Sequence, residues 1–336
     1  MLYATTRTER DVYTVQRALT EDRAPDQGLY VPFRETRFSQ MQLSELEQKS
    51  QQENLAVITN LLFKSRLTAW DLEFTVGRKP LRVQKLGRRT LAGERWHNTA
   101  GDFSCTVAHI SEKLKSSSEI SAGPGTWAQV AEGIASLFAL YAISSQSDFR
   151  QGKEQMDLAV PEGNLLSVVS GWFARSWGLP IGRIVCGCRE DSPLWELIHS
   201  GQLRTDRLVD KNCAAGLELL IYCCGGRREV ERFTDACFAE MSYVPSDNTM
   251  RHLRQGLYVS VISSRRIRAT IPNVWSAHKY ILHPEAVLGY AGLLDYRTAT
   301  GESGWGIVLC DQDPQKALGT IADAFGCSEQ AVRDRL

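Results

Sequence analysis

No stretch of the chain approaches the roughly 18 consecutive apolar residues that typify a membrane-spanning helix. Neither sign of charge predominates, because 39 basic residues are balanced by 39 acidic ones. This balance disfavours a nucleic-acid partner, since phosphate binding normally needs a basic surface. The first ten residues are polar and charged, unlike a secretory signal peptide. These absences predict a soluble, cytoplasmic protein with no membrane and no nucleic-acid partner.

Disulfide and metal frameworks are also missing from the sequence. The nine cysteines are odd in number and irregularly spaced, which does not suit a set of paired disulfides. Cys186 and Cys188, and the adjacent Cys223 and Cys224, lack the spacing of zinc ribbons and fingers. No metal is therefore expected, and Cys186 is predicted to be a small buried residue at a strand end. The chain also contains no Walker loop, G-x-G-x-x-G, G-x-S-x-G or H-E-x-x-H motif.

What the chain does contain is typical of a folded α/β protein. Its 336 residues, 43% of them apolar, are enough for a large core and about two domains. Residues 1–115 form a first region, 116–126 a linker rich in Ser and Gly, and 127–336 an α/β domain. In the last of these, strand-like and helical runs alternate, beginning with a helix that Thr126 is expected to cap. The alternation predicts βαβ units and a parallel sheet.

The most informative local feature is a turn at 160–167, between a predicted strand and a predicted helix. Gly163 suits a tight turn, and Asn164 is the predicted N-cap of the helix. The backbone amides and the positive end of the helix dipole would then face any bound anion. The turn is therefore a candidate phosphate site, although turns of this kind are common in α/β proteins.

A second feature gathers His97, Asp102, Ser104 and Cys105 within nine residues. Such a cluster could supply acid, base and nucleophile to an enzyme. Catalytic groups usually converge from separate elements, however, so residues close in sequence rarely form a triad. The alternative is a loop that leads into a helix beginning near Asp102 or Ser104.

Several motifs, taken together, resemble threonine synthase. They are M-L-Y-A-T-T-R at 1–7, A-P-D-Q-G-L-Y-V-P at 24–32, V-P-E-G-N at 160–164 and G-L-P-I at 178–181. Their order along nearly the whole chain makes the resemblance specific. It implies the three-layer, parallel-sheet α/β fold of the tryptophan-synthase-like enzymes, which is fold type II of the pyridoxal-phosphate enzymes. It also implies an enzyme that holds this cofactor as a lysine Schiff base and converts O-phosphohomoserine to threonine.

The segment that should carry the lysine departs from the family pattern. The family sequence H-G-P-T-x-A-F-K-D corresponds to residues 97–105, where His97 and Phe103 match and Ser104 takes the lysine position. A hydroxyl cannot form an imine, so the covalent cofactor linkage would be lost.

Other parts of the expected site are also changed. The phosphate loop keeps Gly163 and Asn164 but has Leu166 at its second glycine position, where a side chain would crowd a phosphate. The family's T-A-H-P reads Asp-Gln-Asp-Pro at 311–314, so the residue that faces the pyridine nitrogen in the family is also changed. Between 115 and 127 the family has a substrate-gripping subdomain, so the expected fold is shortened by its loss.

These departures favour a threonine synthase-like pseudoenzyme. It would bind no pyridoxal phosphate and act as a ligand- or partner-binding scaffold, with a small anionic metabolite at Gly163 and Asn164, near His97 and Ser104. One alternative is altered chemistry by the cluster around Asp102 and Ser104. Another is a threonine synthase or related lyase that still uses pyridoxal phosphate. Homo-oligomer formation is left open.

Overall fold

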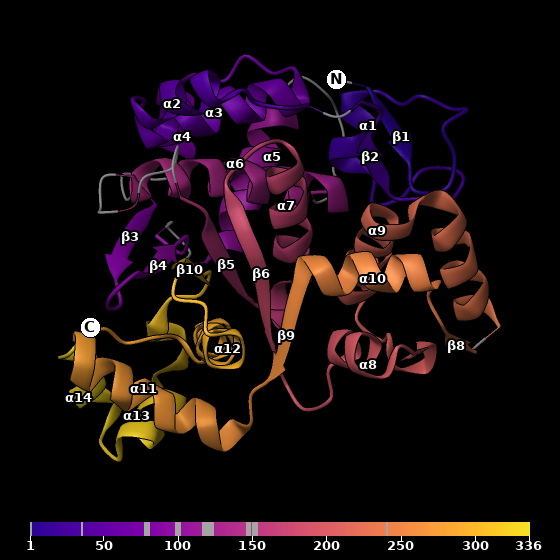
Figure 1. Cartoon of the computed structure of the whole chain (residues 1–336). Helices are drawn as coiled ribbons and strands as arrows, with labels where there is room; N and C mark the ends of the chain where they lie inside the picture. Colours follow the sequence, from indigo (N-terminus) through magenta and orange to yellow (C-terminus); the bar gives the residue numbers. More distant parts are fainter. Residues whose placement is uncertain are drawn as a thin grey trace.

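A mostly parallel sheet forms the centre of the molecule in the computed structural model, which describes residues 2–34, 36–76, 81–97, 102–115, 124–145, 149, 154–239 and 241–336 (Figure 1). Its six strands lie in the order β3-β4-β10-β5-β6-β9. Only β3 runs antiparallel to its neighbour. The strands are β3 (Arg82–Lys85), β4 (Thr90–Glu94), β5 (Met156–Pro161), β6 (Ile181–Cys188), β9 (Leu257–Val261) and β10 (Trp305–Cys310). The predicted α/β class and parallel sheet are confirmed.

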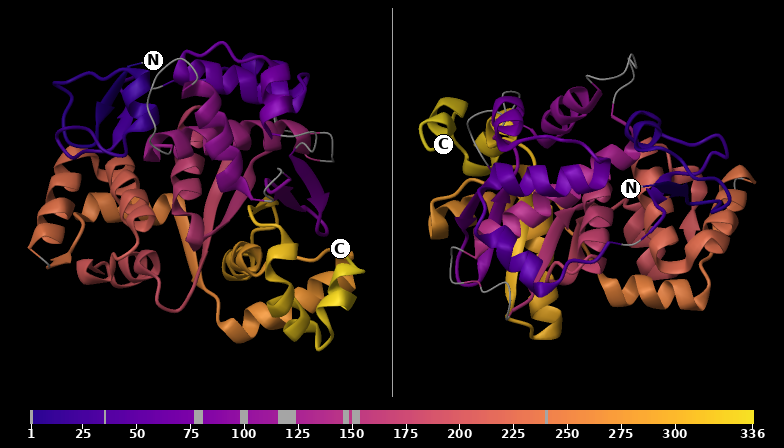
Figure 2. Two further views of the ribbon diagram at one scale, coloured as in Figure 1. Left: turned by 180° about the vertical axis from the view of Figure 1, so that it is seen from behind. Right: turned by 90° about the horizontal axis from the view of Figure 1, so that it is seen from above.

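Helices cover both faces of this sheet, which gives the expected three layers (Figures 1 and 2). On one face, α7 (Leu165–Ser176) packs on β5 and β6, and α6 (Thr126–Ser144) packs on α7. On the other face, α12 (Pro284–Thr300) packs on β5, β6 and β10. Next to α12 lie α11 (Ser264–His278), α13 (Leu318–Phe325) and α14 (Glu329–Arg333). A separate apolar cluster fills each side of the sheet.

The N-terminal region adds a small two-stranded sheet and a layer of helices. Strands β1 (Tyr3–Thr5) and β2 (Tyr30–Pro32) pair antiparallel. The helices are α1 (Val15–Thr20), α2 (Gln40–Glu47), α3 (Gln51–Phe63), α4 (Ala69–Val76) and α5 (Phe103–Lys115). Because β3 and β4 also come from residues before the predicted linker, both sides of that linker contribute to the central sheet.

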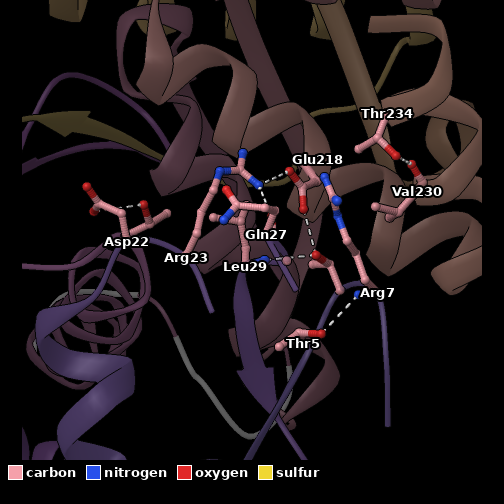
Figure 3. Close-up of polar contacts among 12 residues, drawn as sticks. Thr5, Arg7, Asp22, Arg23, Gln27, Leu29, Glu218, Val230 and Thr234 are labelled. Carbon is pink, nitrogen blue, oxygen red and sulfur yellow. Dashed lines mark hydrogen bonds and ion pairs between the residues drawn. The ribbon is translucent and has the colours of Figure 1, made fainter. Parts of the chain in front are cut away.

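A buried carboxylate attaches the N-terminal region to α9 (Lys211–Phe238), a pair of helical segments joined by a kink at Gly226 (Figure 3). Glu218 accepts hydrogen bonds from the Thr6 hydroxyl at 2.6 Å and from Arg23 at 2.8 Å. The Thr6 hydroxyl in turn accepts from the backbone amide of Leu29 at 2.9 Å. Around α9 lie α8 (Pro193–Ser200), β7 (Leu203–Arg204), β8 (Ser242–Tyr243) and α10 (Asp247–Gly256).

Local signals predicted several of these elements, but not every expected helix cap is correct. Asn164 is the N-cap of α7, where its side chain accepts from the Ser167 amide, and Cys186 is buried in β6. Thr126 was expected to cap α6, but it is the first helical residue and Gly125 is the N-cap. A Cβ on Gly125 would lie 2.5 Å from the carbonyl oxygen of Glu21, so only glycine fits there. Most of the predicted linker, residues 116–123, falls outside the described residues.

Within the described ranges, no helix has both the length and the apolar character needed to cross a membrane.

Candidate functional site

A cleft of about 610 Å³ opens at the carboxyl ends of the parallel strands. In open α/β sheets this edge is the usual place for a ligand site. Its walls come from the 3₁₀ turn η1 (Glu162–Asn164), the first turns of α5 and α7, and the start of α9. Four residues singled out in the sequence line it together: Ser104, Gly163, Asn164 and Leu166.

Ser104 lies in the first turn of α5, where Asp102 organises the helix start. Asp102 accepts hydrogen bonds from the Ser104 hydroxyl and from the Cys105 amide, the latter at 3.1 Å. Its second oxygen lies 2.6 Å from Nζ of Lys316, in the 3₁₀ turn η3 (Pro314–Ala317). Partial burial alone would raise the pKa of Asp102, but Lys316, Ser104 and Cys105 together outweigh it and hold that pKa at about 2.

The depressed pKa of Asp102 leads to a pH-dependent prediction. Because the folded-state pKa of about 2 lies below the ordinary value of 3.8, the ion pair stabilises the fold above that value and is lost as the pH falls towards 2. We expect Asp102→Asn to lower the free energy of unfolding by about 1 kcal/mol at pH 7, since the pair is partly exposed.

Urea unfolding at pH 7 and near pH 3 checks this, with the exposed Glu190→Gln variant as a control. The gap between wild type and Asp102→Asn should shrink at the lower pH. A gap that stays constant, or that Glu190→Gln reproduces, would contradict the assignment.

A buried arginine lies behind the cleft and holds one of its lining residues, Asp311. The Arg95 side chain is fully buried after β4, and its guanidinium makes a paired contact with Asp311, at 2.6 Å from Nε and 2.7 Å from Nη2. Nη2 also donates to the Ser167 hydroxyl at 2.8 Å. The guanidinium carbon lies 3.9 Å from the centre of the Phe103 ring, close enough for a cation–π contact. The Asn164 amide donates to the same Asp311 carboxylate.

The turn predicted to bind an anion is surrounded by the chain's own carboxylates. Asp311 is bound by Asn164, and a Cβ on Gly163 would lie 3.2 Å from a carboxylate oxygen of Glu285, which pairs with Arg189. Glu162, in the turn itself, accepts from the Ser192 hydroxyl, and burial raises its pKa. The positive end of α7 thus faces internal acidic groups.

The structure does not assemble the whole cluster of His97, Asp102, Ser104 and Cys105 at the cleft. Of the four, only Ser104 lines it. The His97 ring contacts the Glu94 carboxylate and lies 3.9 Å from the Trp96 ring, next to a separate, smaller cavity. Burial, followed by the Asp102 charge, raises the pKa of the Cys105 thiol, which disfavours a thiolate. In the described part of the chain, no group of three His, Cys, Asp or Glu side chains could hold a metal ion.

Sequence reasoning missed the residues that determine the electrostatics of the cleft. Arg95, Glu285 and Lys316 belong to no local motif, and their partners are distant in the sequence. The one available signal was Arg95 itself, because a charged residue next to the apolar strand β4 needs a buried partner.

Comparisons with known proteins agree with this architecture. Residues 2–78 match the family described as the threonine synthase N terminus. Threonine synthase from Pseudomonas aeruginosa is 22% identical over 224 residues, which are 62% of this chain and 47% of that protein. The sequence match therefore spans about half the length of that curated relative.

Solved structures of threonine synthases share the fold over nearly the whole chain. The pyridoxal-phosphate-bound enzyme from Brucella melitensis superposes with a TM-score of 0.80 at 17% identity, covering 97% of this chain and 91% of that one. The yeast enzyme gives 0.79 at 14% identity, covering 97% and 90%. The chain therefore resembles the threonine synthases: it shares their fold, and its N-terminal residues match that family's N-terminal region.

Proposed function

We propose that this threonine synthase-like protein has lost pyridoxal-phosphate-dependent catalysis and uses its cleft to bind a ligand or partner. The observation that carries the proposal is Ser104, at the lysine position, which opens onto the cleft from the first turn of α5. Among the described residues that line the cleft, none is a lysine. The Lys316 amine pairs with Asp102 at 2.6 Å and is not among the residues that line the cleft.

Two other parts of the expected cofactor site, the phosphate-binding turn and Asp311, do not suit pyridoxal phosphate either. The turn that would hold the cofactor's phosphate already has internal partners: the Asn164 amide donates to Asp311, and Glu285, paired with Arg189, lies beside Gly163, so a phosphate would have to displace them. The Asp311 carboxylate already accepts from Nε and Nη2 of Arg95 and from the Asn164 amide, so most of its roughly four acceptor positions are taken. The residues present therefore do not fit pyridoxal phosphate.

The same carboxylates weigh against the expected anionic metabolite at Gly163 and Asn164, which stays a prediction. The alternative of altered chemistry has weaker support, since Asp102, with a pKa of about 2, is a poor base for the Ser104 hydroxyl. A cytoplasmic location and a homo-oligomer also stay predictions.

Borohydride trapping after incubation with pyridoxal phosphate tests the proposal. We expect no visible absorption band from an internal aldimine, and only slow, non-saturating labelling spread over exposed lysines. Lys316→Ala should label like wild type. Saturable labelling of one lysine, abolished by substituting that lysine, would overturn the proposal.

Complementation of a threonine auxotroph gives an independent readout. We expect no growth from wild type and none from Ser104→Lys, because the Arg95–Asp311 pair and the carboxylates around Gly163 remain in the variant. Growth supported by the wild-type chain would show that it is an active threonine synthase.

A further inference from the structure

A second, small cavity lies between α3, α5 and α6. Its volume is about 10 Å³, which is close to the space that one water molecule needs. Phe103 lines both this cavity and the cleft, so the two spaces adjoin the same residue. The other lining residues are Leu55, Thr59, Leu81, Arg95, His97, Thr106, Ile110, Glu132, Ala135 and Ser136.

Two buried polar atoms without a protein partner belong to residues that line this cavity. One is Nη1 of Arg95, and the other is Oε2 of Glu132; both residues are 2% exposed. The remaining nitrogens of Arg95 donate to Asp311 and Ser167. On Glu132, Oε1 has one long contact, 3.5 Å from the Ser111 hydroxyl.

Leaving both groups unsatisfied would be unfavourable. A buried donor or acceptor without a partner loses its hydration and gains nothing in return. Burial raises the pKa of Glu132 well above its usual range, which favours the neutral acid, a form that can both donate and accept. A guanidinium donor and a carboxylic acid on the wall of one water-sized space are the partners that a buried water needs.

We propose that this cavity holds one buried water molecule that bridges Nη1 of Arg95 and Oε2 of Glu132. The water accepts from Arg95 and donates to Glu132. It completes a polar chain from Glu132 on α6 through Arg95 to Asp311 and Asn164 at the cleft. Glu132 is thereby a positioning residue: it acts through Arg95 on Asp311, which lines the cleft. This inference is independent of the proposed loss of catalysis.

High-resolution crystal structures of wild type and of Glu132→Gln provide the test. We expect a water peak within hydrogen-bond distance of both Nη1 and the residue 132 side chain in each structure, because the amide also donates and accepts. A dry cavity in wild type, or a direct contact between Arg95 and Glu132, would overturn the proposal.

Glu132→Leu removes the acceptor without removing much volume. We expect its structure to lack the water and its Arg95 guanidinium to move relative to Asp311. Its melting temperature should fall several degrees below that of Glu132→Gln. If Glu132→Leu does not fold, the wild-type and Glu132→Gln structures decide the question alone. An Arg95–Asp311 contact that stays unchanged in Glu132→Leu would refute the positioning role.

Discussion

Replacing Arg95 by methionine should lower the free energy of unfolding by about 3–5 kcal/mol, the usual cost of stranding one partner of a buried ion pair. The Asp311 side chain is only 11% exposed, and in the variant it would keep Asn164 but lose both guanidinium contacts. The Ser167 hydroxyl would lose its donor as well. Equilibrium unfolding in urea at pH 7 measures the effect.

Two matched variants distinguish the stranded charge from simple loss of packing. Arg95→Met combined with Asp311→Asn should recover part of the loss, because no uncompensated carboxylate remains. Arg189→Met removes an arginine from a more exposed pair with Glu285 and should cost about 1 kcal/mol or less. An Arg95→Met variant as stable as Arg189→Met would show that the buried pair does not support the fold.

Gly187→Ala should be at least as damaging, because α12 packs directly on this residue of β6. A Cβ added to Gly187 would lie 1.9 Å from the carbonyl oxygen of Leu288 and 3.0 Å from the amide nitrogen of Gly289. Both atoms are backbone in the middle of a buried helix, so relief requires α12 to move away from the sheet. We expect a loss of about 3 kcal/mol or more in the free energy of unfolding, the upper end for an overpacked core.

Gly304→Ala is the matched control, since a Cβ there meets nothing within 4 Å and the backbone is not left-handed. It should change the free energy of unfolding by less than about 0.5 kcal/mol. Urea unfolding of both variants, with soluble yield as a second readout, checks the contrast. Equal stability of Gly187→Ala and Gly304→Ala would show that α12 is not held tightly on β6.

The predictable part of the fold consists of signals carried within a few residues. Asn164 caps α7 because its side chain reaches an amide three positions ahead, and the apolar run at 181–188 forms a buried strand. The cap at Thr126 was wrong because a long-range contact, between Gly125 and the backbone of Glu21, selects the residue at that position. Tertiary packing overrides local preference at such points.

The sequence by itself determined the α/β class, the turn at 160–167 and the family resemblance that places Ser104 at the lysine position. Only the tertiary structure decided which charged side chains pair beside and behind the cleft. Arg95 and Asp311 are 216 positions apart, and Lys316 and Asp102 are 214 apart. Hydrophobic periodicity and caps report on neighbouring residues, whereas charge pairing depends on how distant strand ends converge at one sheet edge.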